Sequence, residues 1–143
     1  MDLNASFTQP MRDELTRIGF TELTTPAAVD TALGAKSGTA LVFVNSVCGC
    51  AAGMARPGVA RALAATSVRP DQLYTVFAGQ DRDATARARE HFVDAPPSSP
   101  SIALLKDGAL VAFVPRHQIE GKNADMVAAQ VVAALEEHCI STA

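Results

Sequence analysis

The segment Thr39–Asn45 constrains the fold of this chain more than any other, because it is an almost unbroken apolar run, TALVFVN. A strand with one face in water alternates apolar and polar residues, whereas a strand covered on both faces is apolar throughout. Segments of helical character lie on either side of this run, over residues 25–33 and 50–66. The pattern predicts an α/β protein with a central sheet between two layers of helices.

The other segments continue the alternation. Apolar spacing predicts helices over residues 10–18, 83–92 and 123–139, and strands over 20–23 and 73–78. Residues 102–105 and 110–114 flank Asp107 and Gly108, a pair that favours a tight hairpin, so these strands should be antiparallel. Within residues 50–66, Pro57 indicates either a kink or the start of the regular helix. We therefore expect one domain over residues 1–143, with a mixed five-stranded sheet, helices on both faces and an extra N-terminal helix.

Charge and cysteine content exclude several classes of protein. The net charge is −3 and the basic residues are scattered, which gives no electrostatic case for nucleic acid or an anionic membrane. No apolar run approaches the roughly 20 residues that span a bilayer, and the first residues lack the order of a signal peptide. We expect a cytoplasmic protein, where a close cysteine pair is suited to catalysis or metal binding.

Cys48 and Cys50 are the candidate catalytic residues, separated by Gly49 at the junction of the apolar run and the next helix. Unpaired amides and the helix dipole favour a thiolate at a helix start, and the thiolate is the nucleophile of disulfide exchange. We expect Cys48, at the cap, to attack and Cys50, in the first turn, to resolve. Residues i and i+2 of a helix do not face each other. A Cys48–Cys50 disulfide therefore needs a departure from helical geometry, which Gly49 permits, and should be strained and readily reduced.

Two alternatives stay open for the cysteine pair. A zinc site takes about four ligands, and no histidine lies within forty positions of Cys48 or Cys50. A metal ion or iron–sulfur cluster would therefore require Cys-x-Cys pairs from two chains in a dimer; otherwise we expect no metal and no cofactor. The other alternative is a redox-responsive binding protein, in which the disulfide alters a surface. Cys139 follows Val127, Val131 and Leu135 at four-residue spacing, which predicts a packed apolar residue there, with a thiol at a frayed helix end as the alternative.

The order of elements and the place of the cysteines after the second strand resemble the thioredoxin fold. The chain also resembles the bacilliredoxin family, in the segments MRDELTRIGF (11–20), VNSVCGCAAG (44–53), ARP (55–57), PPSSPS (96–101) and RHQIEG (116–121). The resemblance implies a cis bond between Ser99 and Pro100, beside the cysteines, where the backbone of Ser99 can pair with an extended chain. It also implies attack by Cys48 on mixed disulfides between proteins and low-molecular-weight thiols, or isomerisation or reduction of protein disulfides.

Arg116 and His117 follow the last expected strand, on a loop that the thioredoxin resemblance places near the cysteines. His117 is a candidate for stabilising the Cys48 thiolate or moving its proton. The alternative is that both are surface residues that pair with Glu120. The expected supporting residues are therefore Gly49, Ser99, Pro100 and His117, and we expect the chain to be a monomer or a weak homodimer.

Overall fold

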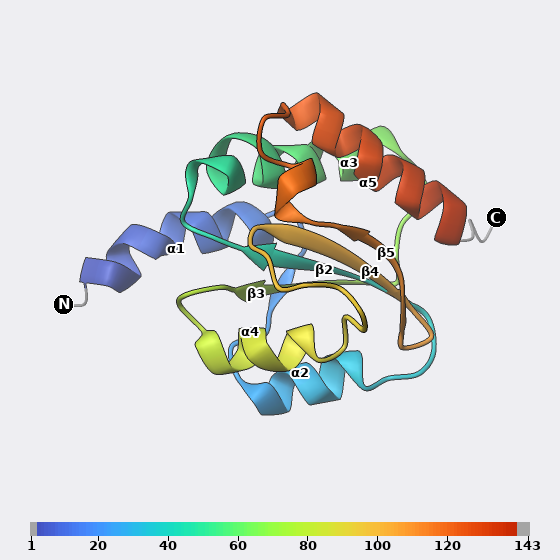
Figure 1. Ribbon diagram of the computed structural model, residues 1–143, viewed down its shortest axis with the longest axis horizontal. Coiled ribbons are helices and arrows are strands. Elements are labelled where there is room, and N and C mark those ends of the chain that lie inside the picture. Colours follow the sequence, from blue (N-terminus) through green and yellow to red (C-terminus); the bar gives the residue numbers. More distant parts are fainter. Residues whose placement is uncertain (1–2, 140–143) are drawn as a thin grey trace.

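The computed structural model describes residues 3–139, which form a five-stranded sheet in the order β1-β3-β2-β4-β5 (Figure 1). The strands are β1 (Thr21–Glu22), β2 (Thr39–Asn45), β3 (Gln72–Phe77), β4 (Ser101–Lys106) and β5 (Ala109–Val114). β3 is parallel to β1 and β2, whereas β4 is antiparallel to β2 and β5. Asp107 and Gly108 both have positive φ, 53° and 84°, as the predicted hairpin turn requires. The sheet is mixed, as expected.

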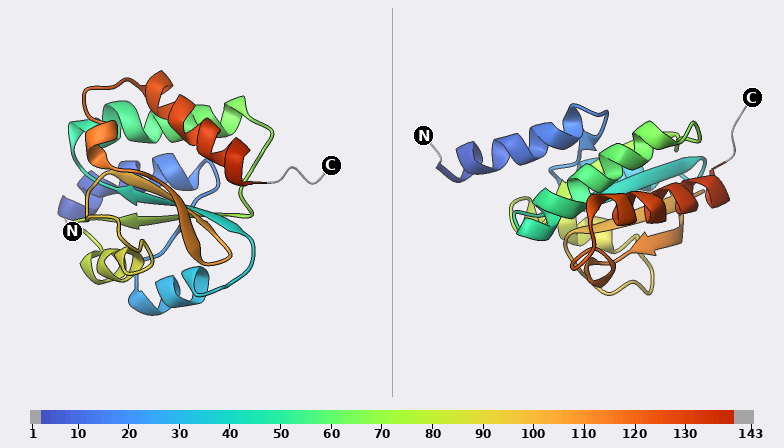
Figure 2. Two further views of the ribbon diagram at one scale, coloured as in Figure 1. Left: turned by 45° about the vertical axis from the view of Figure 1, so that its right-hand side comes forward. Right: turned by 90° about the horizontal axis from the view of Figure 1, so that it is seen from above.

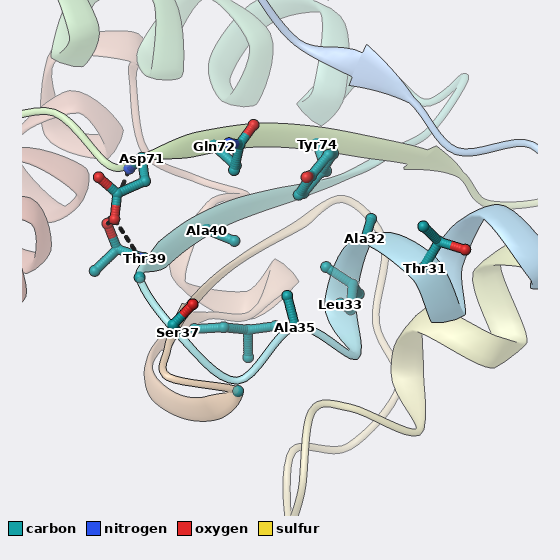
Figure 3. Close-up of a pocket in the computed structure, with 13 residues that line it drawn as sticks. Thr31, Ala32, Leu33, Ala35, Ser37, Thr39, Ala40, Asp71, Gln72 and Tyr74 are labelled. Atoms are coloured by element: carbon teal, nitrogen blue, oxygen red, sulfur yellow. Dashed lines mark hydrogen bonds between the residues drawn. The ribbon is translucent and has the colours of Figure 1, made fainter.

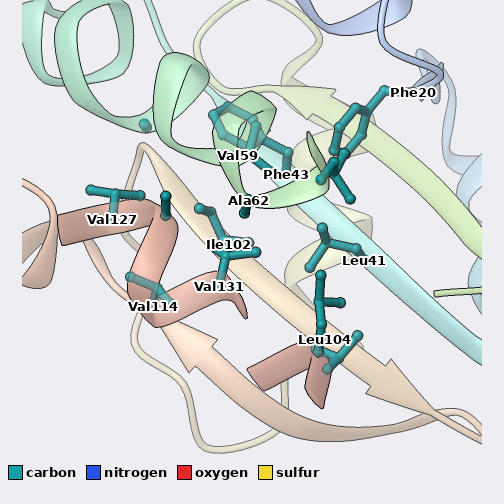
Figure 4. Close-up of a cluster of buried hydrophobic side chains, with 14 of the residues drawn as sticks. Phe20, Leu41, Phe43, Val59, Ala62, Ile102, Leu104, Val114, Val127 and Val131 are labelled. Carbon is teal, nitrogen blue, oxygen red and sulfur yellow. The ribbon is translucent and has the colours of Figure 1, made fainter. Parts of the chain in front are cut away.

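Helices cover both faces of the sheet. α3 (Arg56–Ala65) and α5 (Ala124–His138) cover one face, and α2 (Pro26–Leu33) and α4 (Arg82–Arg89) cover the other (Figures 1 and 2). Alternate residues of β2 enter two separate cores: Leu41 and Phe43 pack with α3 and α5 (Figure 4), whereas Val42 and Val44 pack with α2 and α4. All four are fully buried, which confirms the prediction drawn from the apolar run.

The N-terminal helix α1 (Leu3–Thr16) is longer than the sequence predicted, because it starts at Leu3 and continues through Pro10. Residues 4–10 are exposed except Thr8, so they show no apolar stripe by which a helix could be recognised. The first strand is shorter than expected, since it covers Thr21–Glu22, although the amide of Leu23 also donates to the Thr75 carbonyl of β3 at 2.8 Å. α4 likewise ends at Arg89 instead of residue 92. None of the helices in the described range is long and apolar enough to cross a membrane.

The helical segment after β2 is divided in two. A turn of π-helix over Ala51–Ala55 comes first, and the regular helix α3 then begins at Arg56 with Pro57 in its first turn. Of the two predictions for Pro57, a kink or the start of the regular helix, the second is confirmed. Val59 and Leu63 of α3 are buried against α5 and the sheet.

Candidate active site

The two close cysteines lie at the carboxyl end of β2, the central strand. The carbonyl of Cys48 accepts hydrogen bonds from the amides of Ala51 and Ala52, both at 3.2 Å, so Cys48 caps the following helix. The sulfur atoms of Cys48 and Cys50 are 3.1 Å apart, and both thiols are free and partly exposed. Because Cys48 precedes the first helical residue, the rule that separates side chains at i and i+2 of a helix does not apply to this pair. The two sulfur atoms can therefore approach each other, because Cys48 lies outside the helix.

The surroundings of the two thiols shift their pKa values in opposite directions. Burial acts to raise the pKa of Cys48, but hydrogen bonds from the Ser46 hydroxyl, the Cys50 thiol and the amides of Ala51 and Cys50 outweigh it, and the pKa of Cys48 is lowered. Burial raises the pKa of Cys50, and the hydrogen bond to Cys48 and its negative charge raise it further. The arrangement favours a thiolate at Cys48 and a protonated thiol at Cys50.

Gly49, the third member of the motif, has open space around it. A Cβ atom built on Gly49 meets no other atom within 4 Å, and the residue is exposed. The reduced form therefore does not need glycine here for space.

The loop before β4 lies at the same end of the sheet as the cysteines. Val44, four residues before Cys48, pairs with Ser101 in the antiparallel register, which brings the preceding residues of the loop to this edge. The Ser99–Pro100 bond is cis, as the resemblance implied.

Arg116 links this loop to the cysteines. It donates from Nη1 to the Ser99 carbonyl at 3.3 Å, and its Nε pairs with Glu120, also at 3.3 Å. Its positive charge opposes the larger effect of burial on Cys50 and favours ionisation of that thiol. The pairing with Glu120 that the sequence allowed is therefore present, and Arg116 also has an electrostatic role at the site.

His117 is exposed on the same short turn, Arg116–Gln118. Within residues 3–139, no hydrogen bond or ion pair joins His117 to either thiol of the pair. The structure thus brings together Cys48, Cys50 and the loop containing Pro100, and adds Arg116, while any role of His117 stays a prediction.

Arg56 is the residue that sequence reasoning missed. It is 3% exposed and is the one charged residue among the buried residues of the described range. It lies one helical segment beyond the cysteines and contacts Asn45 and Ser46, the two residues that connect β2 to the Cys48 turn. An arginine within a helical sequence is ordinarily solvated. No local sequence pattern indicated that Arg56 is buried. The one available signal was its place in ARP (55–57), a segment that resembles the bacilliredoxin family.

Cys139 packs as predicted. It is buried in the same core as Val127, Val131 and Leu135 of α5, and burial raises the pKa of its thiol. Burial and the raised pKa both disfavour a thiolate at Cys139.

A cavity of about 420 Å³ lies at the other end of the sheet, by the starts of β2 and β3 (Figure 3). Thr39, Asp71 and Tyr74 contribute to its lining, and no cysteine does. The Asp71 carboxylate is already engaged, since it accepts hydrogen bonds from the amide of Thr39 at 2.8 Å and from its hydroxyl at 3.3 Å. In the part of the chain that the structure describes, no three His, Cys, Asp or Glu side chains are grouped to hold a metal ion.

This sheet order, with paired cysteines capping the helix after the central strand and a cis proline before β4, defines a thioredoxin-like protein. The solved structures that share the fold include two thioredoxins. The thioredoxin of Fasciola hepatica has a TM-score of 0.57 and 17% identity, covering 83% of this chain and 99% of its own. Thioredoxin O2 of Arabidopsis thaliana has a TM-score of 0.55 and 14% identity, covering 87% of this chain and 97% of its own.

The chain belongs to the disulphide isomerase family, whose model matches residues 3–139. Its relatives include a bacilliredoxin of Bacillus cereus, 55% identical over 130 residues, which are 91% of this chain and 90% of the relative. A bacilliredoxin of Geobacillus kaustophilus is 51% identical over 138 residues, covering 96% of this chain and 95% of the relative. The resemblance to bacilliredoxins is confirmed, and with the fold it supports a thiol–disulfide oxidoreductase type of function.

Proposed function

We propose that this protein is an oxidoreductase of bacilliredoxin type, which uses Cys48 and Cys50 to remove low-molecular-weight thiols from mixed disulfides on proteins, or to isomerise or reduce protein disulfides. The observation that carries the proposal is the pair of free, partly exposed thiols with sulfur atoms only 3.1 Å apart at the start of a helix, where the pKa of Cys48 is lowered and that of Cys50 is raised. Lowering the pKa of Cys48 supplies the attacking thiolate near neutral pH. Raising the pKa of Cys50 keeps the second thiol protonated until the first step is complete.

The first step is attack by the Cys48 thiolate on the small-thiol sulfur of the mixed disulfide. The disulfide of the substrate breaks, its protein sulfur leaves as a thiolate and takes up a proton, and a new disulfide joins Cys48 to the small thiol. The cysteine of the protein substrate is thereby returned to a thiol, and the disulfide now lies between Cys48 and the small thiol.

The second step releases the small thiol. Once Cys48 is in a disulfide, its negative charge no longer raises the pKa of Cys50, so Cys50 ionises more easily. The Cys50 thiolate then attacks the Cys48 sulfur, the small thiol leaves, and a Cys48–Cys50 disulfide remains for a thiol reductant to reduce. Alternatively, a second small-thiol molecule attacks the small-thiol sulfur and leaves as a disulfide of two small molecules.

The surroundings of the cysteines suit a protein substrate. Both thiols are partly exposed, and the apolar side chain of Val47, directly before Cys48, is 44% exposed. We propose Gly49, Ser99, Pro100 and His117 as supporting residues at this surface. The working form is proposed to be a cytoplasmic monomer or weak homodimer.

The test follows release of glutathione, used as the probe thiol, from a glutathionylated model protein. The expected result is loss of release with Cys48→Ser and full release with the matched control Cys139→Ala. Full release with Cys48→Ser contradicts the proposal. Zinc or iron that copurifies with the protein under anaerobic conditions and is lost with Cys50→Ser would favour the cluster alternative. A partner whose binding depends on the redox state, without turnover, would favour the redox-responsive binding protein.

A further inference from the structure

Arg56 is a buried cation whose place in the core needs an explanation beyond stability. The guanidinium pairs through Nε with Glu14 of α1 at 2.8 Å, but Glu14 is 40% exposed while Arg56 is 3% exposed. The arginine thus bears most of the loss of hydration. Buried ion pairs are often no more stabilising than apolar residues of the same volume. Stability alone therefore does not account for a charged side chain here.

A continuous chain of hydrogen bonds runs from Arg56 to the attacking cysteine. Arg56 Nη1 donates to Asn45 Oδ1 at 2.9 Å and to the Ser46 carbonyl at 3.0 Å. Asn45 Oδ1 also accepts the Ser46 amide at 2.9 Å, so both backbone polar groups of Ser46 are held by the same pair of side chains. The Ser46 Oγ in turn accepts the amide of Cys48 at 3.3 Å.

The path of the backbone explains how Arg56 reaches this position. Side chains of a helix are tilted towards its N-terminus, so a residue in the first turn of α3 points back towards the start of the helical segment. Arg56 is the first residue of α3, directly after the π turn Ala51–Ala55 that separates it from the cysteines. Single π turns are frequent at functional sites.

We propose that Arg56 is a positioning residue for the thiol chemistry: it fixes Asn45 and the Ser46 peptide, and thereby holds the Ser46 hydroxyl, which accepts the Cys48 amide, and the turn that carries the Cys48 sulfur. The inference rests on the proposed function and adds a residue to its site. The other ionisable groups at the site are Cys50 on the same turn and Arg116 from the loop after β5.

The experiment measures the rate at which iodoacetamide labels Cys48 as a function of pH, with mass spectrometry of the labelled peptide. In Arg56→Met we expect the labelling rate at neutral pH to fall by roughly three- to ten-fold, the effect of weakening one hydrogen bond to a charged group, with the profile moved to higher pH. Arg56→Lys keeps the charge but not the forked contact, and should give an intermediate loss. The matched control is Arg61→Met, since Arg61 lies on the same helix but is exposed and pairs with Asp125; its rate should equal that of the wild type.

Ser46→Ala tests whether Arg56 acts through Ser46. The double variant Arg56→Met/Ser46→Ala should label no more slowly than the slower single variant, since both changes interrupt one chain of contacts. The proposal is overturned if folded Arg56→Met has the pH profile of the wild type, or if the effects of Arg56→Met and Ser46→Ala multiply. If Arg56→Met does not fold, a wild-type profile in Arg56→Lys overturns it instead. Labelling needs no disulfide substrate, so this result is independent of the exchange assay with Cys48→Ser.

Discussion

Gly58 is the point at which α3, the helix that follows the cysteines, comes closest to α5. A Cβ atom at Gly58 would lie 2.6 Å from Cγ1 and 2.7 Å from Cβ of Val127, closer than real Cβ atoms approach. Val127 is fully buried in the core and cannot turn away freely. We therefore predict that Gly58→Ala destabilises the protein by separating the two helices.

The magnitude follows from two opposing effects. Overpacking a core costs about 1–3 kcal/mol, while replacing glycine by alanine within a helix contributes about 0.5–1 kcal/mol of stability. The net expectation is a loss of about 1–2 kcal/mol, because the contact at 2.6 Å is with a branched side chain that is itself packed. For a domain of this length, the melting temperature should fall by roughly 3–8 °C.

Urea and thermal denaturation measure this effect, with Gly53→Ala as the matched control. A Cβ atom at Gly53 meets nothing within 4 Å, so that variant should be at least as stable as the wild type. Adding Val127→Ala to Gly58→Ala removes the obstructing methyl groups, and the double variant should be more stable than the sum of the single changes predicts. Wild-type stability of Gly58→Ala would refute the reasoning.

Three further predictions concern the thiols. Labelling of Cys48 should reach half its maximum at a lower pH than labelling of Cys50, because the pKa of Cys48 is lowered and that of Cys50 is raised; iodoacetamide titration with peptide mass spectrometry measures both. Cys139→Ala should leave the rate of glutathione release unchanged within about two-fold, since its thiol is buried away from the pair; the glutathione-release assay measures this. Arg116→Gln should slow the release step by about two- to five-fold at low salt, because a partly exposed charge that favours the Cys50 thiolate is lost; stopped-flow kinetics measure it.

Each of these has a contradicting result. Equal labelling midpoints for Cys48 and Cys50 would remove the basis for their unequal roles. Loss of release in Cys139→Ala would give the third cysteine a role that its burial does not explain. A rate in Arg116→Gln equal to that of the wild type at every salt concentration would show that this charge does not act on Cys50.

The parts of the fold that the sequence predicts correctly are those specified by neighbouring residues. The apolar composition of β2 by itself indicates that both faces of the strand are buried. Asp107 and Gly108 are residue types that favour the positive φ values of their turn. The buried residues of α5 that end at Cys139 are predicted by their four-residue spacing. The cap position of Cys48 is likewise local, because a strand ends and a helix begins within a few residues of it.

The parts that could not be predicted depend on contacts between distant residues. The burial of Arg56 follows from Glu14, 42 positions earlier, and from Asn45 on another element. The contact of Arg116 with the Ser99 carbonyl depends on how one short turn is oriented over the loop before β4, which no sequence pattern specifies. The start of α1 was missed because a mostly exposed half-helix has no apolar period.

The most direct test of the account is to trap the intermediate in which Cys48 carries the small thiol. Cys50→Ser is mixed with a glutathionylated protein, and intact-mass and peptide mass spectrometry locate the glutathione. We predict that one glutathione is transferred to Cys48 and stays there, while the wild type releases it and the substrate protein is recovered reduced. Transfer to Cys50 in the Cys48→Ser variant, or no transfer to Cys48 in Cys50→Ser, would contradict the assigned roles.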